Sequence, residues 1–101
     1  MVFTTNGFRY EIREVPDVSS AIVDIRGSKM GFRGELSGAC LHDKGLILID
    51  ANQSEAERGR TLLHEALHAI IPSMDERRVR RIEKDLYRLV RRCGYRYPDL
   101  G

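Results

Sequence analysis

The five consecutive residues His64-Glu65-Ala66-Leu67-His68 constrain this chain more than any other segment. Histidines four apart stand one turn apart on the same face of an α-helix, so both rings can direct a nitrogen at one metal ion. The glutamate between them would lie beside that ion, where its carboxylate can take a proton from an attacking water. The motif therefore predicts a helix here and, on it, the core of a zinc site with Glu65 as general base.

The length and composition fit one small domain spanning residues 1–101. Of the 101 residues, 42% are hydrophobic and 32% are charged, which suits a single folded core and argues against a disordered chain. No apolar run approaches the roughly 20 residues that cross a bilayer, and the first residues lack a secretory signal pattern. With only Cys40 and Cys93, we expect free thiols in a cytoplasmic protein without a membrane partner; a single disulfide is the alternative.

The first half of the chain carries strand patterns. Residues 8–15 alternate as a strand does, and residues 20–26 fit either a second strand or a short helix. Glycines punctuate residues 27–45 as turns, with room for a short edge strand around residues 32–36. The apolar run Leu-Ile-Leu-Ile-Asp at residues 46–50 predicts the best-buried strand.

A helix that contains the histidine pair is predicted over residues 54–71. Ser54 and Glu57 have the spacing of a capping box, in which each side chain bonds the backbone N–H of the other residue. Pro72 then interrupts the helical pattern. The zinc-site motif is thus expected inside a capped helix rather than in a loop.

A second helix is predicted to reach about Cys93, where Gly94 ends it. Ser73 and Glu76 have the same capping-box spacing, and the short linker predicts an antiparallel helix pair. The fold class is therefore α+β, with a short N-terminal sheet followed by this pair. The stripe that faces the core is expected to consist of Val79, Ile82, Leu86, Leu89, Val90 and Cys93.

The positive charge gathers in this second helix. Residues 1–72 carry 8 Lys and Arg against 10 Asp and Glu, whereas residues 73–101 carry 9 against 5. At about 100° per residue, one set of cations points away from the core. A solvated outer face is the ordinary interpretation, and a nucleic acid is the alternative partner. The cations are Arg77, Arg81, Lys84, Arg88 and Arg92.

A catalytic zinc site needs a third protein ligand, and no histidine follows His68. Glu76 and Glu83 both fall on one border of the apolar stripe of the second helix, from which either can reach the first helix. Each also has an ordinary structural role open to it. Glu76 can belong to the capping box with Ser73, and Glu83 can pair with Arg80 one turn earlier.

The run TLLHEALHAIIPSMDERRVRRIEKDLYRLV resembles small phage and bacterial zinc metallopeptidases related to the ImmA/IrrE and SprT-like groups. Those proteins pair an HExxH helix, preceded by an apolar strand like LILID, with a carboxylate or histidine on a later element. The resemblance implies a zincin-like domain with Zn²⁺ held by His64, His68 and Glu76. Asp75 and Glu83 are the alternatives to Glu76 as the third ligand. The gap of eight residues between His68 and Glu76 is shorter than expected of ImmA/IrrE-type proteins.

The expected function is zinc-dependent hydrolysis of peptide bonds in a peptide or protein substrate. An extended peptide could pair with the strand at residues 46–50 if that strand were an edge, and Tyr87 could stabilise an oxyanion, although packing is its more ordinary role. Three alternatives stay open. They are a structural zinc protein or inactive relative, a basic helical module that binds nucleic acid, and two surface histidines beside an unrelated glutamate.

Overall fold

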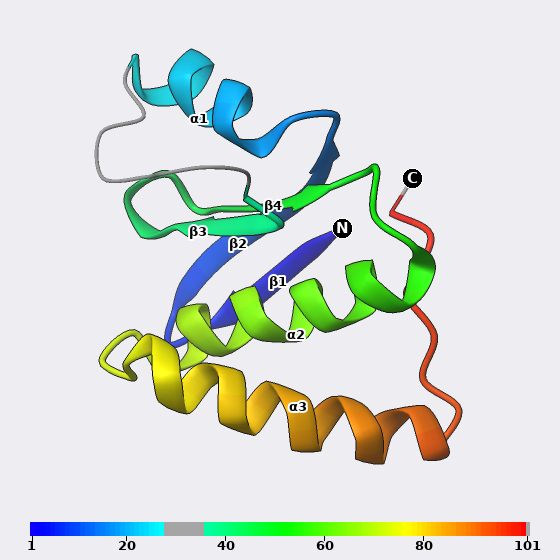
Figure 1. Ribbon diagram of the computed structural model, residues 1–101. Coiled ribbons are helices and arrows are strands. Elements are labelled where there is room, and N and C mark those ends of the chain that lie inside the picture. The colour runs from blue at the N-terminus through cyan, green and yellow to red at the C-terminus, as the bar shows by residue number, and fades with distance from the viewer. Residues whose placement is uncertain (28–35, 101) are drawn as a thin grey trace.

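The protein is a four-stranded sheet with one helix on one face and a second helix on the other, and the last helix packs on the outer side of the second (Figure 1). The computed structural model describes residues 1–27 and 36–100. The predicted α+β class is confirmed. In chain order the elements are β1 (Val2–Thr5), β2 (Phe8–Val15), α1 (Val18–Arg26), β3 (Gly38–Leu41), the 3₁₀ turn η1 (His42–Lys44), β4 (Leu46–Asp50), α2 (Glu55–Ile70) and α3 (Glu76–Arg92).

Strand β4 is the centre of the core. The strand order is β1-β2-β4-β3, and β4 pairs parallel with β2 and antiparallel with β3. Because side chains alternate along a strand, Leu46 and Leu48 pack on the α1 side, whereas Ile47 and Ile49 pack on the α2 side. The prediction of a best-buried strand is confirmed. The idea that a peptide could pair with β4 is wrong, because both of its edges are already occupied.

Residues 20–26, which fit a strand or a helix by sequence, belong to the helix α1. The carboxylate of Asp17 accepts a hydrogen bond from the N–H of Ser20 and caps the first turn. Val18 and Ile22, one turn apart, are both buried against the sheet. The edge strand expected around residues 32–36 lies almost wholly outside the described residues, and β3 follows it at Gly38–Leu41.

Helix α2 begins where its sequence predicts. Oγ of Ser54 accepts from the N–H of Glu57 at 3.2 Å, and the Glu57 carboxylate accepts from the N–H of Ser54 at 3.3 Å. The capping box is confirmed. Leu62 and Ala69 then pack against the sheet. This packing fixes which way the histidine-bearing face of the helix points.

Helix α3 begins two residues later than a Ser73 cap would place it. The N-cap is Asp75, whose carboxylate accepts from the N–H of Arg78 at 2.9 Å. The predicted Ser73–Glu76 capping box is therefore wrong. Asp75, an alternative third metal ligand by sequence, caps the helix instead. Glu76 becomes the first residue of the helix, and its side chain is not used for capping.

The buried face of α3 differs from the predicted apolar stripe. Val79 is fully buried, but Ile82 and Leu89 are 39% and 60% exposed, and Cys93 is exposed. Glu83 is buried in their place, because it faces Arg60 on α2. The helix contacts α2 along one side only, so its second apolar border remains in solvent (Figure 1).

Both cysteines, Cys40 and Cys93, are free thiols, as predicted. Cys40 lies on β3 and Cys93 is the C-cap of α3. Among the described residues, no helix has the length and apolarity needed to cross a membrane.

The cap of α3 can be tested with two alanine substitutions. Asp75→Ala should lower the free energy of unfolding by about 1 kcal/mol, because the N–H of Arg78 loses its acceptor. Asp75→Ser should recover most of that loss, since serine also caps. The measurement is urea unfolding followed by circular dichroism.

The matched control is Ser73→Ala, which should change the free energy of unfolding by less than about 0.5 kcal/mol, as for an ordinary surface position. A larger loss for Ser73→Ala than for Asp75→Ala would contradict the assigned cap.

Candidate metal centre

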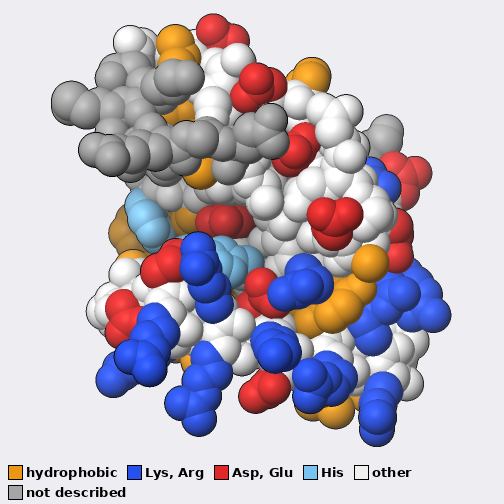
Figure 2. Space-filling model, viewed as in Figure 1, with side chains coloured by type: hydrophobic (Ala, Val, Ile, Leu, Met, Phe, Trp, Pro, Cys, Tyr) orange, Lys and Arg blue, Asp and Glu red, His pale blue; other side chains and the backbone are white. Residues whose placement is uncertain are grey.

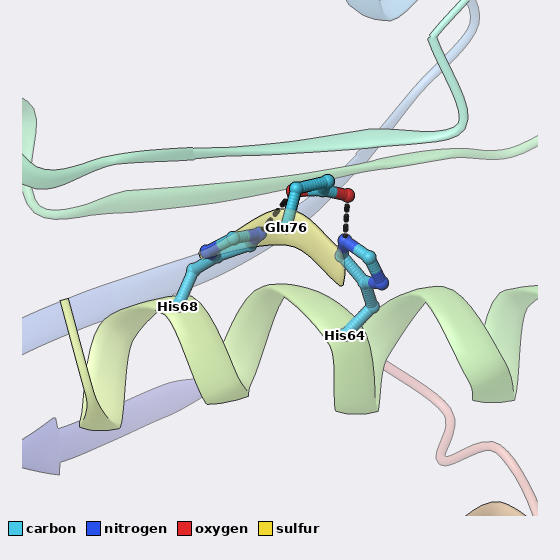
Figure 3. A group of neighbouring side chains, drawn as sticks. All are labelled: His64, His68 and Glu76. Carbon is cyan, nitrogen blue, oxygen red and sulfur yellow. Dashed lines mark hydrogen bonds and ion pairs between the residues drawn. The ribbon is translucent and has the colours of Figure 1, made fainter. Parts of the chain in front are cut away.

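Three side chains converge between the two C-terminal helices (Figure 3). His64 and His68 project from α2, and Glu76 reaches them from the first turn of α3. Nε2 of His64 lies 2.7 Å from Oε1 of Glu76, and Nε2 of His68 lies 2.8 Å from Oε2. One ligand atom from each residue falls within 4.8 Å of the other two. The spacing of the two histidines on α2 and the border position of Glu76 on α3 thus bring the three side chains to one point.

The turn between the helices explains how a gap of eight residues suffices. Helix α2 ends at Ile70, and α3 begins at Glu76 and runs back along it. The start of α3 therefore lies beside the last turns of α2, where the histidines are. Because Asp75 caps the helix, Glu76 stands at its first position with its carboxylate free to face the rings.

The donor set fits a divalent cation. A carboxylate can only accept hydrogen bonds, so in the metal-free protein each Nε2 must carry a proton to bond Glu76. A cation would take the place of those protons. Ligand atoms around a tetrahedral zinc with bonds of about 2.0–2.1 Å lie roughly 3.3 Å apart, so small side-chain movements would accommodate it. Two imidazoles and one carboxylate are ligands that zinc commonly has.

Glu76 is held in its charged form. Partial burial raises its pKa, but the charges and hydrogen bonds of His64 and His68 outweigh this effect and keep the pKa below its ordinary value. Nε of Arg80 also lies 3.4 Å from Oε1 of Glu76. The Glu76 side chain is therefore an ionised carboxylate that can bind a cation.

Glu65 lies beside the cluster, on the inner side of α2, and is only 8% exposed. Burial, and after it the negative charge of Glu76, raises the pKa of Glu65 to about 8. The burial comes partly from β3, where a Cβ built on Gly38 would lie only 3.2 Å from Cγ of Glu65. A cation bound at the cluster would offset the charge of Glu76 and lower this pKa toward neutrality, which is the range that a general base needs.

Glu83, the other candidate ligand, lies outside this cluster. Its Oε1 is 3.6 Å from Nδ1 of His64, the ring nitrogen that faces away from Glu76. Its Oε2 accepts a hydrogen bond from Nε of Arg60 at 3.2 Å. The expected pair between Glu83 and Arg80 is wrong, because Arg60 takes that place. A carboxylate behind a ligating histidine orients the ring and strengthens it as a ligand, and this is the role that the position of Glu83 allows.

The cluster opens into a cavity of about 600 Å³ between β3 and the two helices. Glu65, His64 and Glu76 line its floor together with Gly38 of β3. The remaining lining residues are Leu36, Ser37, Gln53, Glu57, Arg60, Thr61, Arg80, Glu83 and Lys84.

Tyr87, the possible oxyanion donor, and His42, the third histidine of the chain, lie elsewhere. Tyr87 lines a different hollow and packs edge-on against Tyr95, so the idea that it stabilises an oxyanion is wrong. Nδ1 of His42 lies 3.1 Å from the hydroxyl of Tyr10, and in the described part of the chain His42 does not belong to the metal-ligand cluster.

Gly38 and Arg60 belong to the site but carry no clear signal in the sequence. A Cβ at Gly38 would come within 2.5 Å of Cγ2 of Thr61, but only the packing of β3 on α2 reveals this. Arg60 lies one helical turn before His64, a spacing that could have suggested a shared partner.

Comparisons with protein families, curated proteins and solved structures gave no match.

Because Glu65 is buried, we expect the free energy of unfolding of the metal-free protein to depend on pH. Its pKa of about 8 in the folded state exceeds the value of an unfolded glutamate, so folding favours the protonated form. The contribution of Glu65 to the free energy of unfolding is therefore most favourable below about pH 4.5 and is lost as pH rises through about 8. Each tenfold change in proton affinity is worth about 1.4 kcal/mol, so the total loss is several kcal/mol.

Glu65→Gln should remove this cost, raising the free energy of unfolding at about pH 9 by several kcal/mol while changing little at about pH 5. The measurement is urea unfolding in the presence of a chelator. Asp24→Asn, an exposed carboxylate on α1, is the control. An identical pH dependence in the wild type and in Glu65→Gln would contradict the assigned burial.

Proposed function

We propose that this protein is a zinc-dependent metallopeptidase. The observation that carries the proposal is the convergence of His64, His68 and Glu76 on one point beside the buried Glu65. In this arrangement a cation would have three protein ligands, and the cavity in front of it leaves space for water and substrate.

His64, His68 and Glu76 would hold the ion, and Glu83 would keep the His64 ring in place through Nδ1. When bound, Zn²⁺ lowers the pKa of a coordinated water and polarises a substrate carbonyl. Glu65 then acts as the general base: it takes a proton from the attacking water and gives it to the amine that leaves. Its low exposure keeps bulk water from competing for that proton.

Strand β3 is the element that we propose aligns the substrate. It pairs with β4 on one side, and among the described residues no strand pairs with its other side. An extended peptide could add to such an edge through backbone hydrogen bonds. Gly38, at the start of β3, has no side chain between the edge and Glu65.

We also propose kinship with the small HExxH metallopeptidases of the ImmA/IrrE and SprT-like groups. Three features support it: the buried strand β4 comes directly before the motif helix, the motif reads HEALH, and an acid from the next helix joins the histidines. The free thiols Cys40 and Cys93 agree with a reducing compartment such as the cytoplasm.

A structural zinc site is the main alternative. Structural sites are closed, with four protein ligands around the ion. Within residues 1–27 and 36–100, the donor cluster has three members and faces a cavity. This openness favours catalysis over a purely structural role.

The test separates metal binding from hydrolysis. Wild-type protein loaded with zinc should hold one ion per chain and cleave a fluorescently labelled unstructured protein such as casein, and a chelator should stop the cleavage. Glu65→Gln should lower the rate at least about 100-fold, because a general base contributes that much or more, while the zinc content stays unchanged.

Glu57→Gln is the matched control, since Glu57 lines the same cavity outside the cluster and glutamine also serves in a capping box. It should retain both zinc and activity. Wild-type protein that holds zinc yet cleaves nothing, or a Glu65→Gln variant with normal activity, would contradict the proposal.

A further inference from the structure

The outer face of α3 carries a straight stripe of cations. Its members recur at intervals of three or four residues, so at about 100° per residue they fall within an arc of roughly 80°. From Arg77 to Arg92 the stripe is about 22 Å long. Figure 2 shows Lys and Arg side chains gathered over this helix. We define the α3 stripe as Arg77, Arg81, Lys84, Arg88 and Arg92.

None of the five cations of the α3 stripe has an acidic partner in the described part of the chain. Their neighbours on the same helix do. Arg78 pairs with Asp75, Arg80 with Glu76 and Arg91 with Glu55. The stripe is thus a row of charge that the fold itself does not neutralise.

Part of the α3 stripe borders a hollow. Lys84, Arg88 and Arg92 line an open cavity of about 560 Å³, together with Arg60, Tyr87 and Arg91. Among the residues that the structure describes, no acidic side chain lines it. Arg60 and Arg91 are paired with Glu83 and Glu55. The three unpaired cations of the stripe give the hollow a positive potential that favours an anionic group there.

We propose that the α3 stripe binds the sugar–phosphate backbone of a nucleic acid. Phosphates repeat at a regular interval along such a backbone, and double-stranded DNA carries one charge per about 1.7 Å of axis. A straight, regularly spaced row of cations matches a periodic line of charge. Four of the five cations are arginines, whose planar guanidinium groups bind phosphate oxygens in pairs.

Two other anionic partners fit less well. A membrane surface calls for an amphipathic helix with a free apolar face, but α3 packs that face on α2. Only Ile82 and Leu89 stay exposed, and Asp85 lies between them and the stripe. Arginine clusters also bind short acidic or phosphorylated peptide motifs, but the unpaired cations of the α3 stripe continue along about 22 Å of helix, which favours a long backbone with a regular charge spacing.

The surface is separate from the metal centre but adjoins it. Arg60 and Lys84 line both the metal cavity and the hollow beside the α3 stripe. No member of the stripe belongs to the donor cluster. Binding of nucleic acid should therefore occur without metal, so this inference and the proposed peptidase activity can fail independently.

The experiment measures binding to a fluorescent DNA duplex by anisotropy, in a chelator, between about 50 and 200 mM salt. If all five cations contact phosphates, the slope of log K against log salt should approach −4.5, which is a loss of about 500-fold over that range. Arg88→Gln/Arg92→Gln should reduce the slope by about 2 and weaken binding at least about tenfold at the lower salt concentration.

The matched control is Arg9→Gln/Lys44→Gln, which removes the same charge from exposed positions outside α3 and should leave affinity within about twofold. Circular dichroism confirms that both variants fold. Absence of binding at low salt, equal losses in the two variants, or tighter binding to anionic lipid vesicles or a polyglutamate peptide than to the duplex would each overturn the proposal.

Discussion

The packing of α2 against the doubly buried strand β4 is the constraint on which the rest depends. Ile47 and Ile49 of β4 meet Leu62 and Ala69 of α2 in one core cluster, while the other face of β4 packs on α1. A helix held in this way cannot roll about its axis, so its histidines must face α3 and Glu65 must face the sheet. The geometry of the metal-ligand cluster therefore follows from how α2 packs against β4.

Local signals predicted the parts of the fold whose causes are local. The capping box at Ser54 and Glu57, the apolar strand at residues 46–50 and the histidine spacing each depend on neighbours within a turn or two, and the structure has them where the sequence places them. The start of α3 was mispredicted because Ser73 and Asp75 are both good caps, and only the path of the turn chooses between them.

The remaining differences arise from contacts between distant segments. The burial of Glu83 depends on Arg60, 23 residues away, and the exposure of Leu89 depends on how much of α3 lies against α2. Neither can be read from periodicity, which gives the faces of a helix but not their partners. Polar burial of this kind lowers stability, and its concentration around His64 and Glu65 is typical of a functional site rather than of an ordinary core.

X-ray absorption at the zinc edge of the zinc-loaded protein tests most directly whether His64, His68 and Glu76 bind one cation. The spectrum should show only nitrogen and oxygen ligands at about 2.0–2.2 Å, with the multiple-scattering signature of two imidazoles. Substitution of Glu76 by glutamine should alter the first shell, and substitution of Cys40 by serine should not. A sulfur ligand at about 2.3 Å, or a spectrum of hydrated zinc without imidazole, would contradict the account.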